Sequence, residues 1–125
     1  MYHNRANLIG FLGKNGEVKT TRNGTRYTVL SLATKRVWKD RESGQYMSDT
    51  TWHRCVVWGA LGEFAATLAK GAHVQIEGEI RTRQYTEPSS GKKSDLVKKS
   101  ITEIRVFRIN KLDRAQTSDA KEPAA

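Results

Sequence analysis

The sequence predicts an all-β fold with one helix, arranged as a single barrel domain. Most apolar residues recur with the period of two that is typical of half-buried strands, and one segment, residues 60–70, has instead the spacing of an amphipathic helix. Glycine-containing turn signals separate the expected strands. A chain of 125 residues is long enough for one domain whose core folds without disulfides or structural metals.

The N-terminal part of the chain predicts a curved strand followed by a hairpin. Residues 7–12 form a short apolar run that contains one glycine and is followed by another, which is typical of a strand that bends. Asn23-Gly24 is a turn signal that connects residues 17–20 to the strand expected over residues 27–34. The two leucines of this second strand share one face and are expected to point into the core.

The middle of the chain predicts a long hairpin, a third strand and the helix. Residues 38–49 are polar and basic around a Ser-Gly pair, and we expect them to project from the barrel as a hairpin. The third strand follows over residues 51–59. In residues 60–70, apolar side chains at i, i+3, i+4 and i+7 predict an amphipathic helix, with Gly71 as its C-terminal cap and Phe64 filling the core.

The C-terminal part of the chain predicts two more strands. Residues 73–86 alternate between an apolar inner face and a charged outer face, and residues 87–99 have the composition of a basic loop. The last strand, residues 101–112, changes its alternation part-way, which predicts a β-bulge. Five strands with one helix between the third and fourth form the layout of an OB-fold barrel, whose exposed strand face binds oligonucleotides. We therefore expect an OB domain over residues 1–112 and a short disordered tail over residues 113–125.

The third strand carries the most informative pattern in the chain. Because side chains alternate along a strand, two tryptophans and an arginine share one face. This face comprises Trp52, Arg54, Val56 and Trp58, and the other comprises His53, Cys55 and Val57. Two indoles around a guanidinium make a poor core. The face is interpreted either as a stacking platform for bases or as a half-buried surface covered by a loop or a partner subunit.

Other parts of the sequence repeat this chemistry and favour nucleic-acid binding. Strand 73–86 presents two arginines and a tyrosine on its outer face, and a tryptophan stands at the base of the basic hairpin. The formal net charge is +9, and residues 111–125 hold three basic and three acidic residues, so the excess lies on the folded part. Because a duplex hides the faces of its bases, exposed aromatics suit single strands. The predicted nucleic-acid-binding residues are Arg36, Trp38, Arg41, Trp52, Arg54, Trp58, Arg81, Arg83, Tyr85, Lys92 and Lys93.

Catalytic and metal sites are not predicted. The three histidines lack the spacing of metal ligands, and Glu77 and Glu79 precede two arginines on one strand face, so ion pairs are expected there. The single cysteine, Cys55, excludes an internal disulfide and is expected to be buried. We therefore predict a protein that is not an enzyme and has no cofactor. Without a signal peptide or a membrane-spanning apolar run, a soluble cytoplasmic location is expected.

Four segments in combination resemble the bacterial-type single-stranded DNA-binding protein (SSB) family, over about Asn7 to Leu112. The segments are Leu32-Ala33-Thr34 leading to Trp38, Thr51-Trp52-His53-Arg54 running to Trp58-Gly59, Lys70-Gly71, and Ile76 to Tyr85. The resemblance implies an OB fold, a homotetramer, and binding of single-stranded DNA without sequence preference in replication, recombination or repair, at the nucleoid. It also implies that Trp38, Trp52, Trp58 and Tyr85 stack on bases and that His53 lies at a subunit interface.

The C-terminus departs from the family pattern. Family members typically continue through a long linker to an acidic tip that recruits replication and repair enzymes, whereas this sequence ends at Ala125 soon after the last expected strand. Recruitment of replication enzymes through such a tip is therefore not expected. Two alternative functions stay open. One is a replication-restart (primosomal) OB protein that bridges single-stranded DNA and helicase partners, and the other is a structural interaction module whose aromatics are buried at an interface.

Overall fold

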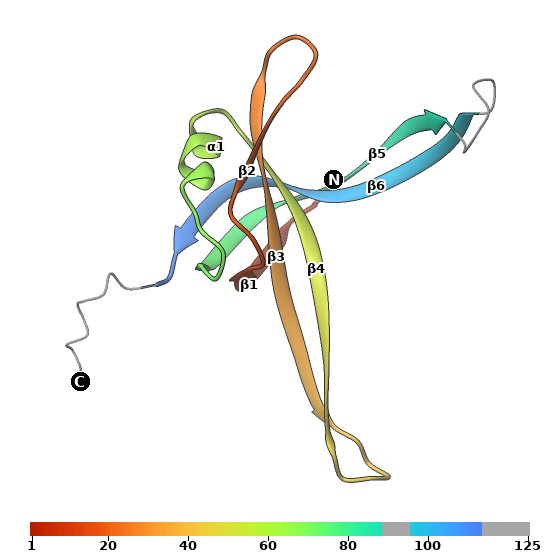
Figure 1. The fold of residues 1–125 in the computed structure, drawn as a ribbon. Helices are drawn as coiled ribbons and strands as arrows, with labels where there is room; N and C mark the ends of the chain where they lie inside the picture. The colour runs from red at the N-terminus through yellow and green to blue at the C-terminus, as the bar shows by residue number, and fades with distance from the viewer. Residues whose placement is uncertain (89–95, 114–125) are drawn as a thin grey trace.

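The computed structural model describes residues 1–88 and 96–113, which form six strands and one helix (Figure 1). In chain order these are β1 (Ala6–Leu12), β2 (Glu17–Thr20), β3 (Arg26–Lys39), β4 (Tyr46–Trp58), α1 (Gly59–Ala66), β5 (His73–Pro88) and β6 (Leu96–Lys111). The strands pair in the order β1-β5-β6-β4-β3-β2, and β1 also pairs with β3. The pairing of β4 with β6 is parallel and the others are antiparallel. The predicted all-β OB barrel with a single helix is confirmed, and the short β2 is an additional strand ahead of the helix.

The barrel closes because β1 bends from one neighbour to the other. Its residues from Ala6 to Phe11 pair with β5, and its last two residues pair with β3. At Gly10, a Cβ atom would lie 2.0 Å from the carbonyl oxygen of Ala33, so a side chain there would push β1 away from β3. The curvature predicted from the glycines of this strand is therefore confirmed, and it depends on the absence of a side chain.

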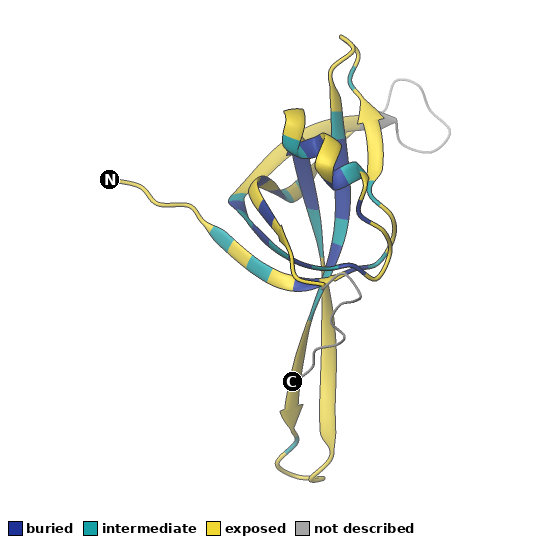
Figure 2. Ribbon diagram, turned by 90° about the vertical axis from the view of Figure 1, so that its left-hand side faces the viewer, coloured by how far each residue is buried: buried dark blue, intermediate teal, exposed yellow. Residues whose placement is uncertain are grey.

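The core lies inside the barrel, on the alternating inward positions of β3, β4 and β5 (Figure 2). Its largest fully buried side chains are Leu30, Leu32, Val57, Val74 and Ile76. Cys55 is also fully buried, as predicted, and burial raises the pKa of its thiol to about 12. The thiol therefore acts as a small apolar side chain at neutral pH.

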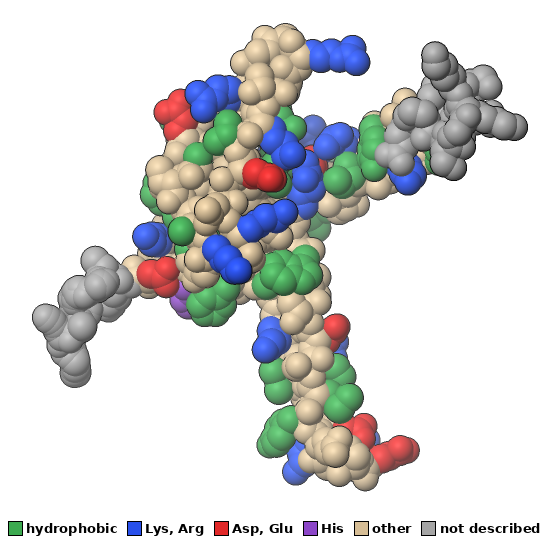
Figure 3. Space-filling view, in the orientation of Figure 1, with side chains coloured by type: hydrophobic (Ala, Val, Ile, Leu, Met, Phe, Trp, Pro, Cys, Tyr) green, Lys and Arg blue, Asp and Glu red, His purple; other side chains and the backbone are tan. Residues whose placement is uncertain are grey.

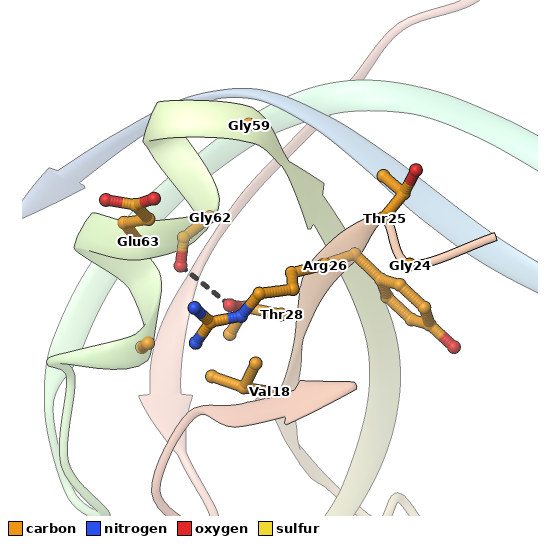
Figure 4. Close-up of a pocket in the computed structure, with 10 residues that line it drawn as sticks. Val18, Gly24, Thr25, Arg26, Thr28, Gly59, Gly62 and Glu63 are labelled. Carbon is orange, nitrogen blue, oxygen red and sulfur yellow. Dashed lines mark hydrogen bonds between the residues drawn. The ribbon is translucent and has the colours of Figure 1, made fainter. Parts of the chain in front are cut away.

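Helix α1 covers one end of the barrel and differs from the prediction at its C-terminus. It packs closely because Gly62 has no side chain: a Cβ there would lie 2.7 Å from the carbonyl oxygen of Val57. The hydroxyl of Thr28 donates a 2.6 Å hydrogen bond to the carbonyl of Gly62 (Figure 4). The helix ends at Ala66, four residues earlier than expected, and Thr67 donates its hydroxyl to the carbonyl of Phe64 at 2.7 Å.

Two predictions about residues near this helix end are wrong. Phe64 is 40% exposed and does not fill the core, whereas Leu68, beyond the helix, is only 3% exposed. Leu68, which belongs to the apolar face predicted for the helix, lies in the turn after it, where its N–H donates to the carbonyl of Ala65 at 3.1 Å. Gly71 has a left-handed φ of 90°, but it lies in the turn before β5, where its N–H donates to the carbonyl of Leu12 at 2.8 Å. It therefore does not cap the helix.

The β3–β4 hairpin projects from the barrel as predicted (Figure 1). The two strands stay paired without interruption from Tyr27 opposite Trp58 to Lys39 opposite Tyr46. In the connecting turn, Asp40 accepts a 2.9 Å hydrogen bond from the N–H of Ser43, and this bond lowers the pKa of the Asp40 carboxyl. The hairpin is therefore an ordered extension of the sheet with almost no core of its own.

Strands β5 and β6 form a second long hairpin that includes the predicted bulge. Glu77 pairs with Arg108 and Gly78 pairs with Val106, so Phe107 is the extra residue and is exposed. Pairing continues to Pro88 opposite Leu96, so the strands occupy much of the segment that was expected to be a loop. Ile80 belongs to the apolar face of residues 73–86 that was predicted to point inward, but it is exposed and lies beyond Gly78, the last residue of β5 that pairs with β1.

A surface pocket of about 560 Å³ lies between α1 and the β2–β3 hairpin (Figure 4). Val18, Arg26 and Glu63 are among the residues that line it. None of the nine predicted binding residues that the structure describes lines this pocket. In the described part of the chain, no helix is long and apolar enough to cross a membrane.

The burial of Leu68 predicts a difference in stability between two substitutions. Leu68→Ala should lower the free energy of unfolding by about 2–5 kcal/mol, because it opens a cavity in the core. Phe64→Ala should cost clearly less, because that ring is already partly in solvent. Urea denaturation of both variants measures the two values, and a larger loss for Phe64→Ala would contradict the observed packing.

Candidate nucleic-acid interface

The outward side chains of β4 form a row, named here the β4 row, of Trp52, Arg54, Val56 and Trp58. The β3–β4 register confirms that they share one face, since Leu30 and Leu32 oppose Cys55 and His53 on the other face. Trp52 is 59% exposed, Trp58 is exposed and Arg54 is half-buried.

Val56 is buried although it belongs to this outward row. It lies opposite Val29 of β3, and the register places Glu17 of β2 and Arg105 of β6 on either side of the pair. Val29 is buried as well. Along β4, the row therefore consists of an indole, a guanidinium, a buried valine and a second indole.

Trp52 lies against the backbone of Gly13, just after β1. A Cβ on Gly13 would lie 2.4 Å from Cζ3 and 2.7 Å from Cη2 of the indole, so the ring occupies the space that a side chain would need. Surface hollows of about 190 Å³ and about 530 Å³ are both lined in part by this ring. Lys14 and Arg54 line the smaller hollow, and Lys35 lines the larger one. The Trp52 ring is therefore exposed on one side, packed against the backbone of Gly13 on the other, and close to lysine and arginine side chains.

Arginines from two strands meet at one carboxylate of a third strand. Arg54 Nε lies 2.8 Å from Glu103 Oε2, and Arg83 Nε lies 3.1 Å from Glu103 Oε1. The Glu103 side chain is 11% exposed, while both arginines are more open to solvent. We call these three residues the Glu103 cluster. Its formal charge is +1, and within residues 1–88 and 96–113 the two arginines engage Glu103 through Nε, so their terminal nitrogens can donate to a ligand.

The ion pairs expected for Glu77 and Glu79 form, but only Glu79 pairs with an arginine of its own strand, and Glu77 pairs with one of β6. Arg81 Nη1 lies 2.9 Å from Glu79 Oε2, and Arg108 Nε lies 3.5 Å from Glu77 Oε1. Sequence reasoning missed Glu103, because its two partners lie 49 and 20 residues away and no local pattern links them. The structure shows that a neighbouring strand supplies the main anionic partner of this face.

Trp58 has an aromatic partner that the sequence did not indicate. Tyr27 lies opposite it in the register, and the two ring centroids are 4.7 Å apart with a tilt of 31°. Pairs in this geometry are attractive beyond their buried area. Ser31 and Ala33 of β3 oppose residues of the β4 row. Tyr27 precedes them in β3 by an even number of residues, so alternation along the strand could have placed it on the same face.

The remaining predicted residues lie away from this centre, on the two hairpins. Trp38 is exposed, with the Arg36 guanidinium 4.7 Å from its ring centroid. Both residues belong to the face of β3 that continues from Leu30 and Leu32, so the hairpin presents them on the side opposite the β4 row. Arg41 is exposed in the hairpin turn.

The other predicted residues belong to the β5–β6 hairpin and to the segment after β5. Tyr85 lies on the outer part of β5, opposite Lys99. Lys92 and Lys93 fall outside the described residues.

His53 faces away from the β4 row and is half-buried. Its Nε2 lies 2.9 Å from the hydroxyl oxygen of Thr34. Burial lowers the pKa of the imidazole below its usual value of 6.5, so the neutral form is favoured at neutral pH. A subunit-interface role for His53 stays a prediction. Among the described residues, no group of three or more His, Cys, Asp or Glu side chains could hold a metal ion.

Comparison with known proteins decides the family. The model of the single-strand binding protein family matches residues 3–112. The chain belongs to this family. An SSB of Plasmodium falciparum, solved in complex with ssDNA, is 30% identical with a TM-score of 0.72, and the match covers 90% of this chain and 97% of that one. A deletion mutant of the single-stranded DNA binding protein of Thermus aquaticus is 29% identical with a TM-score of 0.69. That match covers 89% of this chain and 51% of the other.

The family assignment confirms the resemblance drawn from the sequence motifs. In this SSB chain, the Trp-His-Arg motif places Trp52 and Arg54 outward and His53 inward on adjacent positions of one strand. The Glu-Gly-Glu-Ile-Arg-Thr-Arg motif of β5 places Glu79, Arg81 and Arg83 on the outward face beside β6. The motifs of the family therefore mark the two strands that supply the arginines of the Glu103 cluster, while Glu103 itself comes from β6.

The contact between Gly13 and Trp52 predicts that a methyl group at residue 13 displaces the indole. Gly13→Ala should change the fluorescence emission maximum of Trp52, because the ring must move from its support on the backbone. The measurement uses a protein in which Trp38 and Trp58 are replaced by Phe. A matched protein that keeps only Trp38 is the control and should not change. An unaltered Trp52 spectrum would contradict the contact.

Proposed function

We propose that this protein binds single-stranded DNA without sequence preference, by stacking bases on exposed aromatics and pairing phosphates with arginine and lysine. The single observation that carries the proposal is the β4 row, in which exposed indoles flank a guanidinium on the outside of the barrel. The related SSB of Plasmodium falciparum was solved with ssDNA. That complex supports the same ligand class for this chain.

The chemistry of the row suits single strands better than duplexes. Every base has a π-face, so stacking on Trp52 or Trp58 is tolerant of sequence, and each base–aromatic stack contributes on the order of 1–3 kcal/mol. In a duplex those faces are already covered by neighbouring bases. Base edges in the grooves of a duplex are read mainly by hydrogen bonds from Arg, Lys, Asn and Gln side chains, whereas the most exposed side chain of this row is the indole of Trp52.

Phosphate contacts would come from the cations around the row. The Glu103 cluster contributes two guanidinium groups. Lysine and arginine side chains are also spread over the face of the molecule that Figure 3 shows. The formal net charge of +9 attracts a polyanion over long range and makes binding depend on salt. Aromatic stacking is not electrostatic, so part of the affinity should remain at high salt.

The biological role follows from family membership. Covering and protecting single-stranded DNA during replication, recombination or repair requires binding only, so we propose a protein that is not an enzyme. We further propose a homotetramer, with His53 near a subunit contact, that acts at the nucleoid in the cytoplasm. We also propose that residues 1–112 form the DNA-binding OB domain and that residues 113–125 form a short tail.

Titration of intrinsic tryptophan fluorescence tests the function directly. The protein is titrated with poly-dT, poly-rU and duplex DNA in the same buffer. Strong quenching by poly-dT, and weak or absent quenching by duplex, is expected because bases stack on the indoles. Unchanged fluorescence with all three ligands would favour the alternative of a structural module and would overturn the proposal.

Trp52→Ala should weaken binding of poly-dT by roughly 1–3 kcal/mol, because it removes one stacking platform. The fold should be retained, since the ring is 59% exposed. Trp52→Phe keeps a π-face and is the matched control, with a smaller loss. Binding is measured by fluorescence anisotropy of a labelled oligonucleotide, and melting by circular dichroism. A large drop in melting temperature with unchanged affinity would assign Trp52 to the structure instead.

Glu103→Gln should tighten binding to poly-dT at low salt, because it removes the carboxylate that competes with phosphate for Arg54 and Arg83. If one freed guanidinium then contacts a phosphate, the log–log salt slope should steepen by about 0.7. Glu63→Gln makes the same charge change on exposed α1 and is the control. Equal effects of both substitutions would show that only net charge matters, and weaker binding of Glu103→Gln would show that the carboxylate mainly orients the arginines.

A further inference from the structure

Strand β4 carries aromatic residues at its first, middle and last positions. Tyr46 precedes Trp52 by six residues, and Trp52 precedes Trp58 by six residues. Because side chains alternate with a period of two, all three lie on the same face of the strand. At about 3.3 Å per residue, the intervals are roughly 20 Å each. Tyr46 therefore continues the β4 row onto the projecting hairpin, on the side opposite Trp38.

The surroundings of Tyr46 repeat the chemistry of the row. The ring is 74% exposed, so it contributes little to the core. Lys39 lies opposite in the register, with its Nζ 6.0 Å from the ring centroid. An aromatic ring beside a flexible cation is the combination that the proposed function assigns to Trp52 and Arg54. The side chains between Tyr46 and Trp52 on this face are Ser48 and Thr50. Both are small, so they would not obstruct a nucleic-acid strand that runs along β4.

A purely structural role does not account for this position. Lone exposed aromatics are common on protein surfaces, but this one lies in line with two others at a constant interval. The hairpin is held by uninterrupted strand pairing, so it does not need the ring to keep its conformation. The hairpin extends well away from the barrel and carries hydrophobic side chains at its surface (Figures 1 and 3).

We propose that Tyr46 is a further base-stacking residue and that Lys39 contacts a phosphate beside it. The single strand then follows a track from Trp58 past Trp52 to Tyr46, along the outward face of β4. This inference rests on the proposed function and names two binding residues that it did not include. Trp38 and Arg36, on the opposite side of the same hairpin, form a separate contact.

Substitutions at Tyr46 test the stacking. Tyr46→Leu keeps an apolar side chain without a π-face and should weaken binding of a long dT oligonucleotide by about fivefold or more. Tyr46→Phe keeps the ring and should bind as the wild type does. Tyr2→Leu makes the same replacement at a fully exposed tyrosine that lies outside β4, and it should have no effect. Unchanged affinity of Tyr46→Leu would overturn the inference.

The length of the oligonucleotide separates this contact from the others. A dT oligonucleotide too short to reach from Trp52 to Tyr46 should bind the wild type and Tyr46→Leu equally, whereas a long one should show the loss. Equal losses at both lengths would overturn the track. Lys39→Gln should reduce the magnitude of the salt slope by about 0.7 for the long oligonucleotide only.

Failure of this inference is distinguishable from failure of the proposed function. If the wild type binds no dT oligonucleotide, the proposed function fails. If the wild type binds and Trp52→Ala weakens it while Tyr46→Leu does not, the track ends at Trp52 and only this inference fails. Circular dichroism and melting temperature of Tyr46→Leu should match the wild type, given the exposure of the ring.

Discussion

The antiparallel pairing of β3 with β4 is the constraint on which both the core and the binding face depend. The register that buries Leu30, Cys55 and Val57 also turns Trp52, Arg54 and Trp58 outward. A slip of one residue would exchange the two faces, with a guanidinium and two indoles inside the barrel. Because such a slip would empty the core, the packing free energy of the barrel holds the stacking residues in place. Stability and the proposed binding face are therefore properties of the same pairing.

Electrostatic balance adds a second level of organisation. The arginines of β4 and β5 would repel each other if no anion lay between them, and Glu103 of β6 supplies that anion. The arrangement depends on the parallel β4–β6 contact, which brings Arg54 and Glu103 side by side. The carboxylate orders two guanidinium groups and cancels one of their charges. The face is thus moderately basic, and ion pairs define the positions of its two guanidinium groups.

The projecting hairpin separates the aromatic residues into two sets. Alternation along β3 puts Arg36 and Trp38 on one side, and alternation along β4 puts Tyr46 on the other, in line with Trp52. Each ring has a cation near it, from Arg36 in the first case and from Lys39 in the second. A ribbon of two strands with no core beneath it exposes both faces, so one hairpin can offer contacts in two directions.

Local evidence in the chain was enough to predict several elements. The alternation in β4, the projecting hairpin, the bulge in β6, the burial of Cys55 and the family motifs all depend on residues that are near one another in the chain. Features that depend on distant segments emerge only in the folded protein: the exposure of Phe64, the link from Glu103 to two arginines, and the support of Trp52 by Gly13. The physical reason is that periodicity states which side chains share a face. It does not state which residues of other strands lie opposite or beside them, because that register is set by barrel closure.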